Sequence, residues 1–260
     1  MDHFLPVACI GDHVFVEGEA ALKKARELGS SYQSADPFDH CVIENFLPKE
    51  VAKRLLREFP PMTVREMARS QELYKGNCLP DQLPASAAFA RGLFYTFNSL
   101  PFISFLEELT GIQGLIPDPY YLGGGFHETL RGGRLGIHAD FNIHQKMKLR
   151  RRVNVLVYLN ESWDPAFGGD LELWTRDMKR KAKSVAPLFN RCVIFSTDDD
   201  SWHGHPDPLI CPEGISRKSL ALYYYTASDA IFSERKLNTT NFQARAGSED
   251  HQDWAMHTKY

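Results

Sequence analysis

The sequence predicts an α+β protein that is mainly β, with helices in the first part of the chain and a β-rich core after about residue 115. The segments "PASAAFARGLFYTFNSL" (84–100) and "PFISFLEELTGI" (101–112) have the length and apolar spacing of two helices, which end near Gly111. From residue 134 onward, short runs rich in β-branched and aromatic residues alternate with Gly, Pro, Asn and Asp clusters. Such a succession of short strands is typical of a sandwich or barrel.

The remaining elements follow in chain order. "HCVIENF" (40–46) predicts a strand, and "LPKEVAKRLLREFP" (47–60) predicts a helix with a proline at its start. The later strands are expected in "RLGIHA", "RVNVLVYL", "DLELW", "RCVIFS" and "SLALYYYT". We therefore expect one domain over residues 1–260, with helical support in 1–114, the β-core in 115–230 and a polar tail of little periodicity in 231–260.

Composition limits the classes of partner. The formal net charge is −3 and the pI about 6.4, so no overall positive field indicates nucleic acid. The apolar runs are far shorter than the roughly 20 residues that cross a bilayer, so no membrane partner is expected. "MDHFLPVACIGDH" lacks the basic segment and long apolar stretch of a signal peptide. Five widely spaced cysteines without a CxxC motif favour reduced thiols in the cytoplasm.

The stretch "GIHADFNIH" (136–144) offers three side chains that can bind a metal ion. Alternate residues of a strand share a face, so His138 and Asp140 can point at one ion, whereas His144 is left without a role. An imidazole with a carboxylate suits Fe(II), Mn(II), Co(II) or Zn(II). The alternative interpretation is a hydrogen-bonded pair that closes a turn.

Two further segments favour the metal interpretation. His203 and His205 follow the strand "RCVIFS", and either can complete a set of two histidines and one carboxylate, which leaves coordination positions open. In "ISRKSLALYYYT", Arg217 and Ser219 share one face and can hold a carboxylate, while Lys218 faces away. A polar surface loop and a surface arginine are the alternatives. Asn154, Leu156 and Tyr158 share a face of "RVNVLVYLN", which we expect to line a cavity.

In this order, these motifs resemble the 2-oxoglutarate- and Fe(II)-dependent oxygenases, and more narrowly their prolyl-4-hydroxylase-like branch. The resemblance covers roughly residues 115–228 and rests on "HADFN", "RRVNVLVYLNESW", "GGDLELW", "APLFNRCVIFST", "SWHGHP" and "SRKSLALYYYT". "FDHCVIENFLPKEVAKRLLREFP" is similar to the strand and helix with which this branch begins. The resemblance implies a double-stranded β-helix, or jelly roll, with supporting helices.

The resemblance also implies roles for individual residues. His138, Asp140 and His203 would bind iron and carry catalysis. Arg217 would bind the distal carboxylate of 2-oxoglutarate. The other candidates are pocket residues for 2-oxoglutarate (Tyr158, Ser219, Asn154, Leu171) and substrate residues (His205, Asn142, Arg152). The loop between His203 and Arg217, "GHPDPLICPEGI", is longer than in many relatives.

The implied reaction couples oxidative decarboxylation of 2-oxoglutarate, giving succinate and CO₂, to hydroxylation of an unactivated C–H bond. The expected cofactors and partners are Fe(II), 2-oxoglutarate, O₂, ascorbate as a reductant, and a primary substrate that is a peptidyl residue of prolyl type or a small metabolite. Two alternatives stay open. One is a non-catalytic jelly-roll protein that binds or senses a ligand. The other is a cupin-type metalloenzyme, which would leave Arg217 and Ser219 unexplained.

Two segments near the expected cavity have less specific meanings. The run "KMKLRRR" (146–152) predicts either a solvated hairpin tip or a basic rim that attracts an acidic substrate. "LGGGFHETLRGGR" (122–134) lacks the features of a phosphate loop, and we interpret it as a flexible hairpin or lid at the cavity mouth. The aromatic residues Trp202, Tyr223 and Phe141 are candidates either for shielding the reactive centre or for plain core packing.

Overall fold

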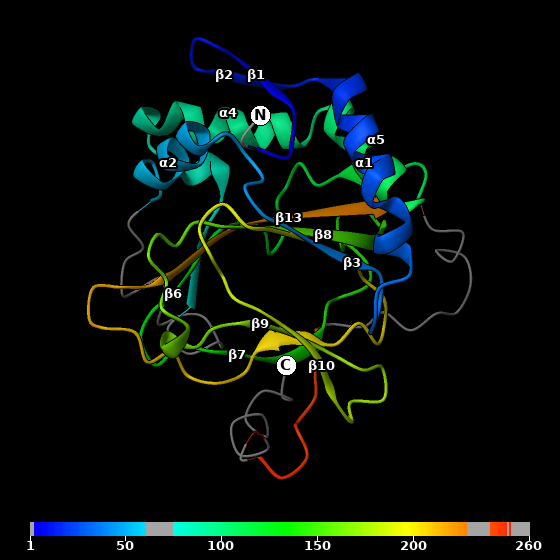
Figure 1. The fold of residues 1–260 in the computed structure, drawn as a ribbon, viewed down its shortest axis with the longest axis vertical. Helices are drawn as coiled ribbons and strands as arrows, with labels where there is room; N and C mark the ends of the chain where they lie inside the picture. Colours follow the sequence, from blue (N-terminus) through cyan, green and yellow to red (C-terminus); the bar gives the residue numbers. More distant parts are fainter. Residues whose placement is uncertain (1–2, 61–74, 228–239, 249, 251–260) are drawn as a thin grey trace.

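Two β-sheets face each other in the computed structural model, which describes residues 3–60, 75–227, 240–248 and 250 (Figure 1). The strands of the larger sheet follow the order β3 (His40–Ile43), β11 (Cys192–Ser196), β8 (Arg150–Tyr158), β13 (Arg217–Thr226), β6 (Gly125–Thr129) and β4 (Lys75–Cys78). A short strand outside this order, β5 (Ile116–Pro117), also pairs with β13. The smaller has the order β10 (Lys181–Val185), β9 (Leu171–Trp174), β12 (His203–His205), β7 (Leu135–Ala139), β14 (Asn241–Phe242). This arrangement confirms the expected double-stranded β-helix with supporting helices.

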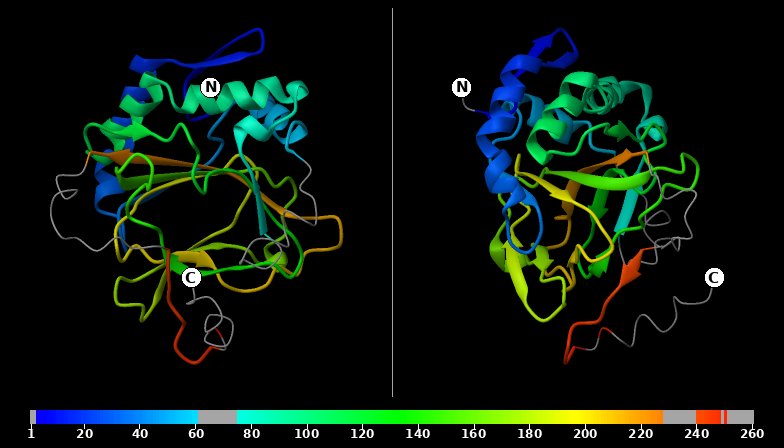
Figure 2. Two further views of the ribbon diagram at one scale, coloured as in Figure 1. Left: turned by 180° about the vertical axis from the view of Figure 1, so that it is seen from behind. Right: turned by 90° about the vertical axis from the view of Figure 1, so that its right-hand side faces the viewer.

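The helices cover the outer face of the larger sheet, and the smaller sheet lies on its other side (Figure 2). They are α1 (Gly18–Gln33), α2 (Lys49–Arg57), α4 (Ala88–Phe97) and α5 (Leu100–Thr110), with short 3₁₀ turns at η1 (Pro80–Gln82), η2 (Ala85–Ala87) and η3 (Pro165–Phe167). A hairpin of β1 (Val7–Ile10) and β2 (His13–Val16) precedes α1. Among the residues that the structure describes, no helix is long and apolar enough to cross a membrane.

Strand alternation decides which side chains meet the helices and which meet the smaller sheet. Val153, Val155 and Val157 of β8 are fully buried and belong to the same core cluster as Phe97 and Phe102 of the helices. The intervening side chains of β8 therefore point to the inner face, between the two sheets. The apolar face of β8 that was expected from the sequence packs against the helices. The polar residues of β8 lie on its opposite face.

Helix α1 was not predicted from the sequence. Its buried positions, Ala21, Ala25, Gly29 and Tyr32, recur at helical spacing, but three of them are small and give little apolar signal. Gly29 faces α5, and a Cβ there would be in ordinary van der Waals contact, 3.7 Å from the backbone oxygens of Glu108 and Leu109. Tertiary packing against α5 therefore determines this helix more than its own hydrophobic pattern does.

The interpretation of 122–134 as a flexible hairpin or lid is wrong for its central part. Residues 125–129 form strand β6, which is hydrogen-bonded to β13 on one side and to β4 on the other. Gly125 is required there, since its φ is +100° and a Cβ would approach the Cys78 backbone oxygen to within 2.4 Å. The glycines of this stretch thus serve a closely packed strand.

Each of the two sheets also contains strands from outside residues 115–230. The predicted strand at 40–46 appears as β3, next to β11, and β4 lies at the other edge of the larger sheet. In the segment expected to be a polar tail, Asn241 and Phe242 pair with Ala139 and His138 of β7. The rest of 231–260 lies largely outside the described residues, and the proposed domain boundaries stay a prediction.

Two leucines of α5 provide a matched test of the helix–sheet core. Leu106 is fully buried and Leu100 is 72% exposed. We expect Leu106→Ala to lower the free energy of unfolding by about 2–5 kcal/mol, because it removes buried methyl groups and leaves a cavity. Leu100→Ala should change it by less than about 0.5 kcal/mol. Urea denaturation followed by circular dichroism measures both, and equal effects would contradict the described packing of α5.

Candidate active site

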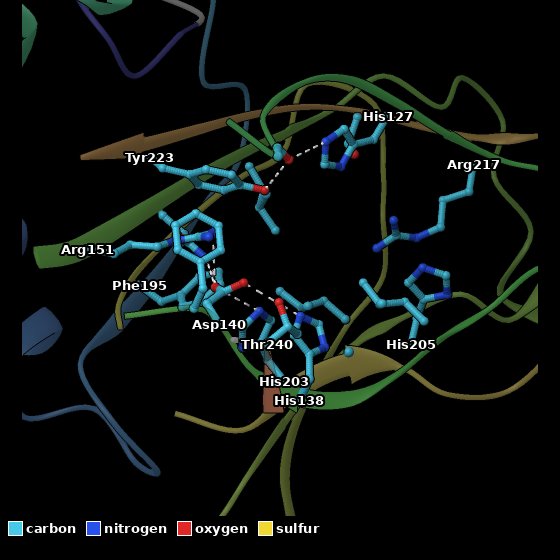
Figure 3. A pocket seen from close by; sticks show the side chains of 18 residues that line it. His127, His138, Asp140, Arg151, Phe195, His203, His205, Arg217, Tyr223 and Thr240 are labelled. Atoms are coloured by element: carbon cyan, nitrogen blue, oxygen red, sulfur yellow. Dashed lines mark hydrogen bonds and ion pairs between the residues drawn. The ribbon is translucent and has the colours of Figure 1, made fainter. Parts of the chain in front are cut away.

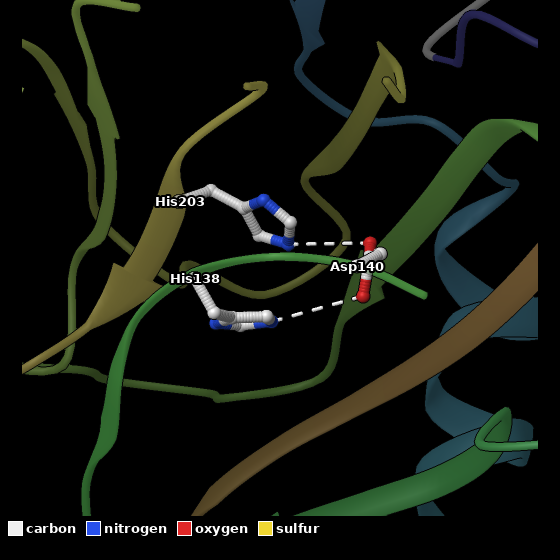
Figure 4. A group of neighbouring side chains, drawn as sticks. All are labelled: His138, Asp140 and His203. Carbon is white, nitrogen blue, oxygen red and sulfur yellow. Dashed lines mark ion pairs between the residues drawn. The ribbon is translucent and has the colours of Figure 1, made fainter. Parts of the chain in front are cut away.

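The candidate metal ligands meet because β12 pairs with β7. His203 is the direct cross-strand partner of His138, and the centroids of their rings are 4.5 Å apart. Asp140 follows the end of β7 and turns its carboxylate toward both rings (Figure 4). Its Oδ1 lies 3.7 Å from Nε2 of His138, and its Oδ2 lies 3.5 Å from Nε2 of His203. One donor atom from each residue lies within 4.8 Å of the others, which is the spacing of a metal site.

Hydrogen bonds orient both imidazole rings for metal binding. Nδ1 of His138 lies 2.8 Å from the Gly136 carbonyl oxygen, and Nδ1 of His203 lies 2.8 Å from the Ser201 carbonyl oxygen. An Nδ1–H that donates to a carbonyl leaves the lone pair on Nε2, which faces Asp140 in both cases. Burial, together with the neighbouring His138 ring, lowers the pKa of His203 to about 4. This ring is therefore neutral at physiological pH, as metal ligation requires.

A second set of groups holds the Asp140 carboxylate. Nδ2 of Asn154 donates to its Oδ2 at 2.7 Å, and Nη2 of Arg151 lies 3.0 Å from the same oxygen. Burial alone would raise the pKa of Asp140, but the Arg151 guanidinium and the His203 ring outweigh it and hold this pKa well below its usual range. The carboxylate is thus ionised and fixed before any ligand binds.

The basic run 146–152 divides: Lys146 and Lys148 are exposed between β7 and β8, as a solvated hairpin predicts, whereas Arg151 departs from both interpretations. Arg151 is only 3% exposed and lies in β8, so it belongs neither to a solvated hairpin tip nor to a basic rim. The pairing of β8 with β13 shifts register here: Val153 faces Tyr224, but Arg151 faces Tyr225. This bulge turns Arg151 to the cavity face, away from the face that Val153 shares with the helices.

The two sheets enclose a cavity of about 160 Å³ that contains the triad and both buried arginines (Figure 3). Arg217 lies at one end, where its Nε donates to the Gly169 carbonyl at 2.7 Å and its Nη2 donates to Tyr158 Oη at 3.2 Å. Gly169 is required for this contact, because its φ is +76° and a Cβ would lie 3.1 Å from Cδ of Arg217. This end presents a buried positive charge to the cavity.

Most of the residues predicted to surround 2-oxoglutarate and substrate line this cavity. Asn154, Leu171, His205 and Ser219 belong to its wall with Arg217. Tyr158 lies outside the described cavity wall and accepts a hydrogen bond from Arg217, and burial raises the pKa of its phenol. The faces of β8 and β13 that were expected from the sequence to line a cavity therefore do line it.

Another part of the cavity wall includes residues of the glycine-rich segment 122–134, which was expected at the cavity mouth, and Thr240, for which the sequence predicted no role. Gly123, His127 and Thr240 line it, together with Tyr223, whose hydroxyl donates to the Gly123 carbonyl at 2.9 Å. Several of these residues are partly exposed, so this is where the cavity reaches the surface. The glycine-rich segment was the one available signal for this mouth.

Other predicted residues lie outside the described cavity wall. Asn142 donates to Asp199 at 3.3 Å, and Arg152 donates to Thr226 at 3.5 Å. Trp202 packs in a core cluster with Ile137 and Ala139, whereas Phe141 and Tyr223 do line the cavity. Of the three aromatic candidates, Trp202 is therefore a core residue.

His144 has a structural role that the sequence did not indicate. Its side chain is fully buried, with Nε2 3.3 Å from Oδ1 of Asp118 and Nδ1 accepting from the Met147 amide at 3.1 Å. Asp118 also accepts hydrogen bonds from the Tyr120 and Leu122 amides. This pair therefore ties the loop before Gly123 to the hairpin between β7 and β8.

Comparison with known proteins agrees with this geometry. Residues 124–225 match the sequence model of the 2OG-Fe(II) oxygenase superfamily. The chain is 26% identical over 198 residues to the prolyl 3-hydroxylase OGFOD1 of Mus musculus, a match that covers 74% of this chain and 34% of the relative. It thus spans about a third of the length of this curated relative.

Solved structures share the fold at low sequence identity. A prolyl hydroxylase from Trichoplax adhaerens, in complex with a peptide of the hypoxia inducible factor, gives a TM-score of 0.55 at 18% identity, over 80% of this chain and 91% of that one. HygX from Streptomyces hygroscopicus, with nickel, 2-oxoglutarate and hygromycin B bound, gives 0.51 at 13% identity, over 84% and 97%. The chain is therefore similar to the 2OG-Fe(II) oxygenase superfamily over residues 124–225 and to a prolyl 3-hydroxylase in sequence, and it shares the fold of solved prolyl hydroxylases.

Proposed function

We propose that the protein is an Fe(II)- and 2-oxoglutarate-dependent hydroxylase whose substrate is a peptidyl residue of prolyl type. One observation carries the proposal: a single buried cavity holds three converging metal donors and, at its far end, a buried guanidinium suited to a carboxylate. Arginine binds carboxylates through paired N–H groups, and the His–Asp–His set leaves coordination positions open. A non-catalytic binding protein would have no need for both features.

The side chains present fit the two cofactors. His138, Asp140 and His203 would hold the iron, since their donor atoms converge and both Nε2 atoms carry lone pairs. Bound iron and 2-oxoglutarate would allow O₂ to oxidise a C–H bond: one oxygen atom forms the new hydroxyl group, and the other enters the succinate that 2-oxoglutarate gives on loss of CO₂. Arg217, with Tyr158 beside it, would bind the distal carboxylate of 2-oxoglutarate.

The remaining wall of the cavity orients the cosubstrate and excludes water. Ser219 contributes a hydroxyl next to Arg217 on the same face of β13, and Leu171 and Leu156 contribute apolar surface. The Phe195 ring packs edge-on against His203, with centroids 4.7 Å apart, and so protects that side of the metal site. A dry, preorganised pocket of this kind strengthens charge interactions and limits side reactions.

The mouth lined by Gly123, His127, Tyr223 and Thr240 is where we place the primary substrate. A peptide is favoured because the curated relative is named a prolyl 3-hydroxylase and one similar structure holds a peptide. A small metabolite is the second candidate, since HygX holds hygromycin B. His205 lines the cavity and stays a candidate substrate residue, whereas the positions of Asn142 and Arg152 give such a role no support.

We further propose that the enzyme works in the cytoplasm with O₂ as cosubstrate and ascorbate as a supporting reductant. All five cysteines are free, and Cys41, Cys192 and Cys211 are buried, which suits a reducing compartment. The support for ascorbate is the family's chemistry, in which the iron must be kept reduced.

Anaerobic titration of the purified protein with Fe(II) and then 2-oxoglutarate tests the proposed function. We expect a weak visible charge-transfer band, followed by succinate formation when air is admitted. His203→Ala should lose the band because a metal donor is gone, and His205→Ala should retain it because that ring is outside the triad. Absence of the band from the unaltered protein, with no succinate, would refute the oxygenase assignment. Loss of metal from His205→Ala alone would show that the wrong histidine was chosen.

Replacement of Arg217 tests the carboxylate anchor. Arg217→Ala should raise the Kd for 2-oxoglutarate about 10- to 100-fold, since a charge-assisted hydrogen bond contributes about 1.5–3 kcal/mol. Lys218→Ala is the matched control, because Lys218 lies on the opposite face of β13 with its Nζ 3.2 Å from Glu128. The intensity of the charge-transfer band against 2-oxoglutarate concentration measures both constants. Equal effects of the two variants would mean that the carboxylate is held elsewhere.

A further inference from the structure

Arg151 is a buried cation inside the cavity that the proposed reaction does not use. Its guanidinium lies against the Tyr223 ring, 3.4 Å from the centroid, and 4.7 Å from the centroid of Phe141. Its Nε donates to Oδ1 of Asn154 at 3.0 Å. Burial of an arginine is costly unless its charge is paired, and the acid that pairs with it is Asp140, one of the three proposed metal ligands.

Arg151, Asn154 and Asp140 form a closed triangle of contacts. Asn154 accepts from Arg151 through Oδ1 and donates through Nδ2 to Asp140, so its amide is held at both ends. Both Arg151 and Asn154 approach the same carboxylate oxygen, Oδ2. Oδ2 also faces His203, at 3.5 Å from its Nε2, and the other oxygen, Oδ1, faces His138, at 3.7 Å from its Nε2.

We propose that Arg151 and Asn154 are positioning residues that together hold Oδ2 of Asp140 and so fix the orientation of this carboxylate toward the metal site. The proposal rests on the proposed function, since it takes the triad as the iron site. Groups that hydrogen-bond to metal ligands fix the orientation of those ligands, and their removal typically weakens metal binding about 10- to 100-fold. Here both groups act on one oxygen, so together they limit rotation of the carboxylate.

The sign of the effect separates positioning from simple charge. If Arg151 acted only as a nearby positive charge, its removal would tighten metal binding, because like charges repel across a low-dielectric cavity. If it positions Asp140, its removal weakens metal binding despite the relief of repulsion. Asn154 carries no charge, so a substitution there reports on positioning alone.

The experiment is a titration of the full-length protein with Co(II) alone, in the absence of 2-oxoglutarate and substrate, followed by visible absorption. Arg151→Met and Asn154→Leu should each raise the Kd for Co(II) about tenfold or more. The visible spectrum of bound Co(II) should also change, because the Asp140 carboxylate is then free to rotate. The double variant should raise the Kd for Co(II) little more than either single variant does, since the two residues act through one oxygen.

Arg150→Met is the matched control, because Arg150 is the preceding residue of β8 and lies outside the described cavity wall. It should leave the Kd for Co(II) unchanged. Thermal melts establish that each variant is folded, and Arg151→Gln serves as the milder substitution if Arg151→Met is not. The proposal requires weaker Co(II) binding in both the Arg151 and Asn154 variants. Unchanged or tighter binding in either folded variant overturns it.

Failure of this proposal is distinguishable from failure of the proposed function. Unaltered protein that binds Co(II), and develops the Fe(II) and 2-oxoglutarate band, would support the function even if both variants bound Co(II) normally. Unaltered protein that binds Co(II) but shows neither band nor succinate would remove the oxygenase assignment, while the effect of Arg151 on the metal site would still be measured. If the unaltered protein binds no Co(II) but develops the band and forms succinate, the positioning proposal alone falls.

Discussion

The pairing of β12 with β7 is the contact on which the candidate site depends. It places His203 opposite His138, and the metal donors converge only while these two short strands stay in register. Gly204 is essential to the pairing, because a Cβ there would lie 2.6 Å from the Gly136 carbonyl oxygen. Any larger residue would force β12 away from β7 and separate the two imidazoles. The spacing of the donors is therefore a property of backbone packing within the smaller sheet.

The larger sheet supplies the groups that hold charge in the cavity. Arg217 on β13 and Arg151 on β8 both point inward, while the opposite faces of the same strands pack against the helices. The apolar helix layer thus makes the strands rigid, and their rigidity fixes two guanidinium groups relative to donors on the other sheet. Such placement on strands is more exact than placement on loops, because packing limits side-chain motion.

Buried charge in this cavity is tolerated because each group has a specific partner. Arg217 donates to the Gly169 carbonyl and to Tyr158, and Arg151 is paired with Asp140 and Asn154. Isolated, each ion would carry a desolvation penalty of several kcal/mol. The same contacts that offset this penalty also orient the side chains, so the electrostatics and the geometry of the site have one origin.

The sequence by itself determined the strand faces, the His-x-Asp motif and the order of the polar residues, because side-chain alternation and local motifs are readable without a fold. On that basis Asn154 on one strand, and Arg217 and Ser219 on another, were expected to face the cavity that they line in the structure. Only the tertiary structure decided the place of Arg151, since a bulge in β8 reverses its face and no local pattern records a register shift. The strand at 125–129 and the helix at 18–33 likewise depend on the tertiary structure, because contacts with segments far away in the chain stabilise both.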